Sequence, residues 1–193
     1  MKKLLITGFD AFGGSTCNPS WMAVEQLPGQ IGSFTLHKRM LPTVYGEAGR
    51  IVIAEAAAFH PDLILCVGVA AGRNAVTPER IGVNIRDART ADNAGNHLQG
   101  AFVVPGGPAA YFATAPVEKM AQAIRDAQIP GAVSNTAGAF VCNDVLYTLL
   151  HYFDGSQTQV GFIHVPALPE QTANGMPLQQ IVAALTAAIQ ACE

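Results

Sequence analysis

Apolar residues along the chain gather in segments of two lengths that alternate. Short runs rich in β-branched residues are typical of strands buried on both faces of a sheet; they cover residues 4–7, 63–69, 132–134 and 160–165. Longer segments have helical spacing, which predicts helices over residues 19–27, 46–59, 117–128, 138–153 and 177–192. Pro19 and Pro177 suit the first turn of a helix. Residues 35–41 and 80–85 alternate more and are candidates for further strands.

This order of strands and helices predicts an α/β fold, in which helices cover both faces of a mostly parallel sheet. No repeat or linker divides the sequence, so we expect a single domain over residues 1–193. The stretch from 90 to 108 is long and irregular, and such loops are usually functional or mobile. It is either an active-site flap or a contact between subunits.

Composition narrows the choice of partners. Charged residues make up 13% of the chain, against about 25% in typical proteins. A chain so poor in charge must bury much of its surface or share it with another copy, so we expect a homo-oligomer. The net charge is −3 without any basic run, which argues against nucleic acid as a partner because phosphate binding needs clustered Lys and Arg.

Neither a membrane span nor an export signal is expected. The apolar run at residues 4–6 is shorter than the roughly 7–15 residues of a signal-peptide core, and no run approaches the roughly 20 residues of a membrane span. The four cysteines form no C-x-x-C pair and no zinc-finger spacing, so no metal is expected. We therefore expect free thiols in a reducing, cytoplasmic compartment.

Ligands of open α/β sheets bind beyond the carboxyl ends of the strands, which here means residues 8–15, 68–73, 135–142 and 164–171. The first segment, GFDAFGGS, lacks the lysine of a phosphate-binding loop. Its Phe9 and Phe12 are unexpected in a turn and could wall a pocket for a small flat ligand. No GxSxG or HExxH motif occurs, which leaves serine-hydrolase and metallopeptidase chemistry without support.

Cys142, His164 and Glu79 are the candidate chemical groups. Cys142 lies where a strand gives way to a helix, and the positive end of a helix dipole favours a thiolate, so we expect a lowered pKa. His164 ends a strand at the ligand edge, where its imidazole could take a proton from a thiol. Glu79 directly precedes a candidate strand and either pairs with Arg80 or orients the imidazole.

Five blocks of sequence together resemble pyroglutamyl peptidase type I, also called pyrrolidone carboxyl peptidase. In order they are GFDAFGGSTCNPSW, CVGVAAGR, TPERIGVNIRDARTADN, SNTAGAFVCN and GFIHVPALPEQ, and the resemblance covers essentially the whole chain. It implies an α/β/α sandwich that cleaves peptides with an N-terminal pyroglutamate in the cytosol, needs no metal or other cofactor, and forms dimers or tetramers.

The resemblance also implies a role for individual residues. Cys142 would be the nucleophile, His164 the base and Glu79 its orienting partner. Arg89 and the backbone N–H of Cys142 would lie beside the oxyanion. The pyroglutamyl ring would lie between Phe9 and Phe12, in a pocket that Asn18 helps to hold and that Val69 contacts.

This chain departs from the family pattern where Val69 and Ala71 replace Gln and Gly, and where Phe140 replaces a frequent Tyr. Val69 is harmless if the contact there is made through the backbone, and Phe140 loses one hydroxyl. Two other functions stay open at this point. A nucleoside-phosphorylase-like transferase would use the glycine turn for phosphate, and a non-enzymatic α/β binding module would have a reactive Cys142 without turnover.

Overall fold

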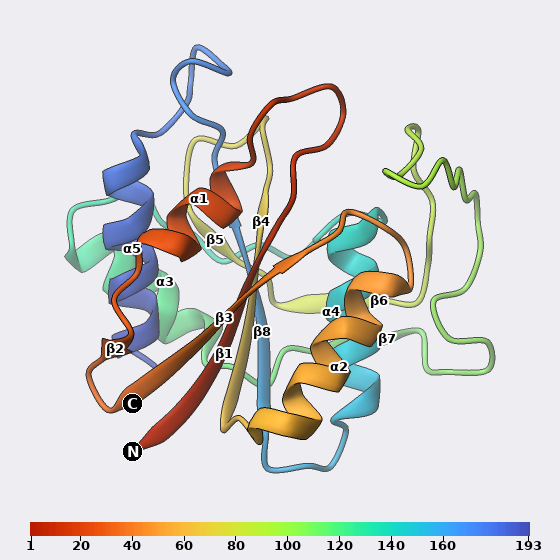
Figure 1. Cartoon of the computed structure of the whole chain (residues 1–193), viewed down its shortest axis with the longest axis horizontal. Coiled ribbons are helices and arrows are strands. Elements are labelled where there is room, and N and C mark those ends of the chain that lie inside the picture. The colour runs from red at the N-terminus through yellow and green to blue at the C-terminus, as the bar shows by residue number, and fades with distance from the viewer.

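Six strands form the central sheet of the computed structural model, which describes residues 1–193 (Figure 1). Their order across the sheet is β2 (Gln30–Ile31), β3 (Phe34–Leu41), β1 (Lys2–Phe9), β4 (Leu63–Val69), β8 (Gln159–Val165) and β5 (Thr77–Pro78). The four long strands are parallel to their neighbours, and the short edge strands β2 and β5 are antiparallel. The mostly parallel sheet predicted from the sequence is confirmed.

Helices cover both faces of this sheet, as Figure 1 shows. On one face lie α1 (Pro19–Gln26), α3 (Val117–Asp126) and α5 (Leu178–Gln190); on the other lie α2 (Glu47–Phe59) and α4 (Val141–Tyr152). Successive strand residues point to opposite faces, so Leu4 and Ile6 belong to the first core and Leu5 to the second. The result is a three-layer α/β/α sandwich.

A separate pair of strands, β6 (Ile81–Val83) and β7 (Ala110–Phe112), packs against α4. The candidate strand at 80–85 therefore exists but lies outside the central sheet. Asn143 of α4 ties the pair down: its side chain accepts from the Val83 N–H and donates to the Val83 and Ile85 carbonyls, at 2.8–2.9 Å. The stretch 90–108, next to this small sheet, is irregular as predicted.

The strand expected at 132–134 is not formed. This segment makes isolated bridges instead, Val76 with Gly131 and Glu79 with Ser134. The neighbouring edge strand β5 contains Pro78, which has no N–H to donate, so the ladder is interrupted there and only single bridges form on either side.

Helix boundaries agree with the sequence pattern to within two residues, except at the start of α4. The helix expected from 138 begins at Val141, and the helix expected from 177 begins at Leu178 with Pro177 as its N-cap. Pro19 occupies the first turn of α1 as predicted, and the Asn18 side chain caps that helix by accepting from the Ser20 N–H. No helix in the chain combines the length and the apolar character needed to span a membrane.

Candidate active site

A cavity of about 180 Å³ opens at the carboxyl edge of the sheet, where β1, β4 and β8 end. Seven of the residues named from the sequence line it, together with Thr43 and Ala137; the seven are Phe9, Phe12, Asn18, Val69, Phe140, Cys142 and His164. The structure therefore brings the aromatic turn after β1, the thiol and the imidazole together around one small and largely apolar space.

Cys142 is the second residue of α4, so its thiol lies at the helix N-terminus as predicted. The α4 end can approach the sheet closely because the strand beneath has Gly68. A Cβ at Gly68 would lie 2.8 Å from the Cys142 Sγ and equally close to the Phe162 ring. Gly68 is also the direct partner of His164 across β4 and β8. The Cys142 thiol therefore lies over Gly68, next to His164 on the neighbouring strand. No hydrogen bond joins the thiol to the imidazole in this structure.

His164 is oriented by a buried carboxylate. Its Nδ1 lies 2.7 Å from Oε1 of Glu79, which has no exposed side-chain surface. A carboxylate can only accept, so Nδ1 carries the proton and Nε2 is left with its lone pair. The backbone of Glu79 is fixed in turn. Its N–H donates to the Phe162 carbonyl, and the residue forms an isolated β-bridge with Ser134.

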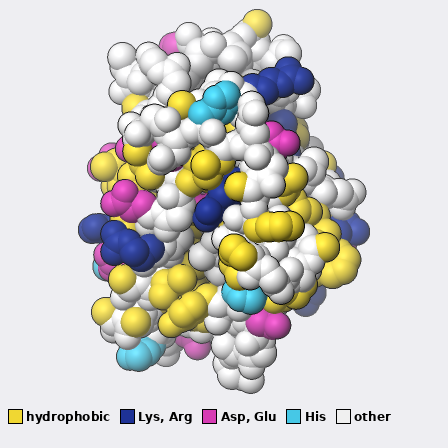
Figure 2. All heavy atoms as spheres, turned by 90° about the vertical axis from the view of Figure 1, so that its right-hand side faces the viewer, with side chains coloured by type: hydrophobic (Ala, Val, Ile, Leu, Met, Phe, Trp, Pro, Cys, Tyr) yellow, Lys and Arg dark blue, Asp and Glu magenta, His cyan; other side chains and the backbone are white.

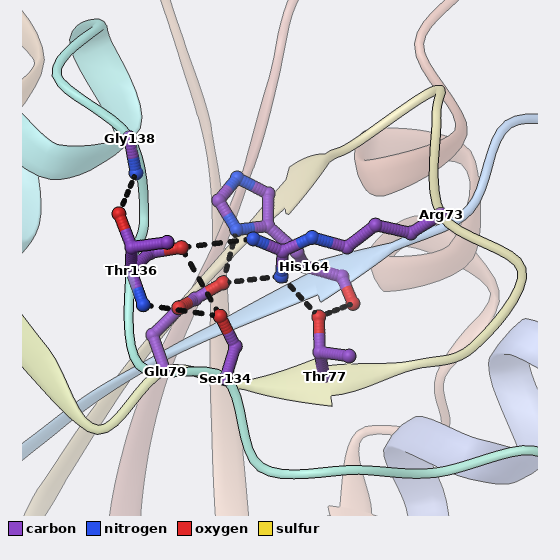
Figure 3. A network of polar contacts seen from close by, with 7 residues as sticks. All are labelled: Arg73, Thr77, Glu79, Ser134, Thr136, Gly138 and His164. Carbon is purple, nitrogen blue, oxygen red and sulfur yellow. Dashed lines mark hydrogen bonds and ion pairs between the residues drawn. The ribbon is translucent and has the colours of Figure 1, made fainter.

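Arg73 completes this network, and sequence reasoning assigned it no role. Its Nη1 donates to Oε1 of Glu79 at 2.6 Å and to Oγ1 of Thr77 at 2.5 Å, and its Nη2 donates to the Thr136 carbonyl at 2.8 Å. Figure 3 shows the guanidinium and the imidazole meeting the same carboxylate. Arg80, the partner considered for Glu79, pairs with Glu118 instead. The one signal for Arg73 was its place in the segment 68–73 after a buried strand.

Burial controls the charge of the thiol and of the imidazole. It raises the pKa of Cys142 to about 12, with the negative charge of Glu79 as the second cause, while Arg73 and the thiol's own backbone N–H act in the opposite direction. Burial also lowers the pKa of His164, against the hydrogen bond and charge of Glu79. The expectation of an acidic thiol is therefore wrong, because lost hydration outweighs the helix dipole. Both shifts favour the uncharged forms, a neutral thiol and a neutral imidazole.

Aromatic rings and a capped turn form the walls of the cavity. The rings of Phe12 and Phe140 lie 5.9 Å apart, and Tyr45 meets Phe140 edge-on at 5.4 Å. Asn18 uses both ends of its amide within the turn, donating to the Asp10 carbonyl and accepting from Ser20. Asn18 therefore stabilises the turn that carries Phe12. The Phe140 ring packs against Phe12 and Tyr45.

The beginning of the irregular stretch braces the same walls. The Asn93 side chain donates to Oδ1 of Asp10 at 3.2 Å and to the Ala11 carbonyl at 2.9 Å, and its backbone N–H donates to the Thr43 carbonyl. Asp10 also accepts from the backbone and hydroxyl of Thr43 at 2.8 Å. These bonds join the turn before Phe12 to the loop that carries Thr43, so this part of the stretch belongs to the frame of the cavity.

The two groups expected beside the oxyanion, Arg89 and the backbone N–H of Cys142, are placed differently in the structure. Arg89 is exposed, makes no hydrogen bond or ion pair, and does not line the cavity. The backbone N–H of Cys142, in contrast, belongs to the first turn of α4, where N–H groups have no acceptor within the helix. Val69 lines the cavity with its side chain, and Ala71 lines a second cavity next to it.

Comparison with known proteins identifies relatives of the whole chain. A model of the pyroglutamyl peptidase family matches residues 2–193. The pyrrolidone-carboxylate peptidase of Levilactobacillus brevis is 47% identical over 196 residues, which cover 98% of this chain and 96% of that protein. The crystal structure of pyroglutamyl peptidase I from Bacillus amyloliquefaciens, 40% identical, superposes with a TM-score of 0.96 and covers 100% of this chain and 97% of that one. Pyrrolidone carboxyl peptidase from Thermococcus litoralis, 34% identical, gives a TM-score of 0.94, with 100% and 93% covered.

Proposed function

This chain belongs to the pyroglutamyl peptidase family and is a cysteine peptidase that removes N-terminal pyroglutamate from peptides, and we propose that Cys142, His164 and Glu79 perform this hydrolysis. One observation carries the proposal: a thiol, an imidazole with a free Nε2 and the buried carboxylate behind it converge on one cavity. This convergence also supports a single catalytic domain over residues 1–193, because the groups come from α4, from β8 and from the residue that follows β5 of one sandwich.

The reaction begins with a proton transfer. Nε2 of His164 takes the proton of the Cys142 thiol as the sulfur attacks the carbonyl carbon of the pyroglutamyl residue. Negative charge moves to the carbonyl oxygen, where the Cys142 N–H and the positive end of α4 stabilise it. The imidazolium then gives its proton to the leaving amine, and a thioester remains on Cys142. Water, with His164 as base, hydrolyses the thioester and releases pyroglutamate.

Glu79 acts through His164. Its carboxylate holds the imidazole in the tautomer that leaves Nε2 free, and it stabilises the imidazolium when the proton arrives. The role expected for Arg89 beside the oxyanion stays a prediction; its side chain is exposed and does not line the cavity.

The cavity supports selection of a blocked N-terminus. Pyroglutamate is a small neutral lactam, and the rings of Phe9, Phe12 and Phe140 offer apolar walls for it. The cavity lining has no Asp or Glu to receive an α-ammonium group. An uncyclised N-terminal Gln would therefore bury an unpaired charge, which costs far more than the lactam does.

We also propose that copies of the chain associate and that they work in the cytoplasm. Phe102, Phe112 and Tyr152 are 63%, 70% and 59% exposed, and Figure 2 shows apolar side chains in groups over the side that carries the small sheet. The four cysteines are free thiols, as in reducing compartments. Light scattering of the purified protein measures the assembly; a monomer at all concentrations would refute it.

The catalytic proposal is tested by mixing the reduced, purified protein with a pyroglutamyl fluorogenic amide. Cys142→Ala and iodoacetamide treatment should each abolish turnover, and Glu79→Gln should lower kcat by a factor on the order of 10⁴. Cys192→Ala is a matched control because Cys192, just beyond the end of α5, lines none of the cavities at the carboxyl edge of the sheet. Turnover that survives Cys142→Ala would show that another group is the nucleophile.

A further inference from the structure

The catalytic cavity continues into further hollows along the carboxyl edge of the sheet. A second cavity, of about 170 Å³, shares Phe12, Asn18 and Val69 with the first. Its other walls come from the turn after β1, the segment after β4 and the loop after β8; they are Ser15, Cys17, Pro19, Ala71, Ala167, Gln171 and Thr172. A third hollow shares Cys17 and Gln171 with the second. The three hollows are therefore neighbours; we call the second and third the trench, and neither is lined by Cys142 or His164.

Hydrolysis of a pyroglutamyl peptide requires room for the chain on the far side of the cleaved bond. In the proposed function the pyroglutamyl ring occupies the first cavity, which has Cys142 and His164 in its walls. On the side of His164 that bears Nδ1, Glu79 and Arg73 fill the space, as Figure 3 shows. The trench beyond Phe12 and Val69 leaves a path for the departing peptide.

We propose that the second cavity binds the side chain of the residue that follows pyroglutamate, and that it selects an uncharged side chain. This inference rests on the proposed function. It goes beyond that function by assigning a site to the leaving group, whereas the catalytic proposal concerns the blocked residue alone.

The chemistry of the walls carries the selectivity. No Asp, Glu, Lys, Arg or His lines the second cavity. A charged side chain bound there would lose water without gaining an ionic partner. The apolar side chains of Val69, Ala71 and Ala167 suit an aliphatic group instead.

Polar atoms at one end of the cavity add a second element of recognition. The Thr172 hydroxyl oxygen is buried and makes no hydrogen bond in the structure. Beside it, the Gln171 amide is held by the Leu168 N–H at 3.0 Å and by the Cys17 carbonyl at 3.4 Å. A buried hydroxyl without a partner is costly, and a bound peptide with a polar group at this point would satisfy it.

Ala71 offers a way to close the second cavity without disturbing the core, because it is exposed. The experiment compares kcat/KM for pyroglutamyl dipeptide amides with Gly, Leu, Lys or Glu as the second residue. The wild-type protein should prefer Leu to Lys and Glu. Ala71→Trp should lower the ratio of Leu to Gly turnover by a factor on the order of ten or more. Ala58→Trp, on the exposed surface of α2, is the matched control and should leave the ratio unchanged.

The outcomes separate this inference from the catalytic proposal. A ratio that is unchanged in Ala71→Trp, or a wild-type preference for Lys or Glu over Leu, would overturn the second cavity as the leaving-group site. Absence of turnover for every pyroglutamyl substrate in the wild-type protein would instead contradict the proposed function itself.

Discussion

Replacing Arg73 with Met removes the cation that shares the Glu79 carboxylate with His164. Glu79 is fully buried and its Oε2 has no hydrogen-bond partner, so after the change His164 alone would hold it. Removing one member of a buried ion pair costs about 3–5 kcal/mol. The Arg73 side chain is 28% exposed, so water can partly replace it, and we expect a loss near the lower end, about 3 kcal/mol. A domain with about 5–15 kcal/mol of stability remains folded after such a loss.

The same change should move the pH dependence of activity in a defined direction. The charge of Arg73 lowers the pKa of His164 and also that of Cys142. Without it both pKa values rise. The base form of His164 is the neutral imidazole, so a higher pKa moves the acid limb of kcat/KM to higher pH. The alkaline limb, where the thiol loses its proton, moves the same way.

The assays are a pH profile of kcat/KM with a pyroglutamyl amide and urea unfolding followed by the fluorescence of Trp21, the single tryptophan. Arg50→Met is the control, because Arg50 is 72% exposed in an ion pair with Glu47 and should change stability by less than about 1 kcal/mol. A merely structural role for Arg73 would reduce stability without shifting the profile. An acid limb that stays in place, or moves to lower pH, would refute the electrostatic argument.

Two further changes probe the frame of the site, and a third prediction concerns the buried cysteines. Gly68→Ala places a Cβ 2.8 Å from the Cys142 Sγ, and should lower kcat/KM on the order of 10²-fold and stability by about 1–3 kcal/mol; wild-type kinetics would contradict this. Asn93→Ala removes two bonds of about 1 kcal/mol each and should raise KM more than it lowers kcat, whereas an unchanged KM would count against the brace. Cys66, Cys142 and Cys192 have pKa values raised to about 12 from 9.0. Above pH 9 the unfolded chain therefore binds fewer protons, and stability should fall by up to about 4 kcal/mol per pH unit. In urea titrations at several pH values, Cys192→Ala should reduce this fall of stability with pH by about a third. A fall identical to that of the wild-type protein would exclude a contribution from Cys192.

The sequence pattern predicted the long elements because their burial is uniform. The strands β1, β4 and β8 are covered on both faces and therefore read as continuous apolar runs. The short strands β2, β5 and β7 have two or three residues each, too few to show a period. The segment 132–134 resembled a strand by composition, yet its pairing depends on Pro78 in a neighbour that no local pattern reveals.

The candidate site was predictable in its parts and not in its contacts. Cys142 and His164 follow from their positions at strand and helix ends, since such positions meet at one edge of the sheet. The pairing of Arg73 with Glu79 depends on how the loop after β4 returns to β5, which spacing alone does not determine. Gly68 left a usable signal, because a glycine inside an apolar strand run often marks a close approach of another group.

The raised pKa of Cys142 has a physical consequence for catalysis. Helix position is visible in the sequence, whereas the close packing of the thiol against Gly68 is not, and the loss of hydration determines the direction of the pKa shift. Because the shifts favour a neutral thiol and a neutral imidazole, the Cys142–His164 pair carries no charge until substrate arrives. Glu79, 2.7 Å from His164, meets an imidazolium only after the proton has moved. The carboxylate and the α4 N-terminus therefore stabilise the transition state more than the resting enzyme, which is the condition for raising kcat.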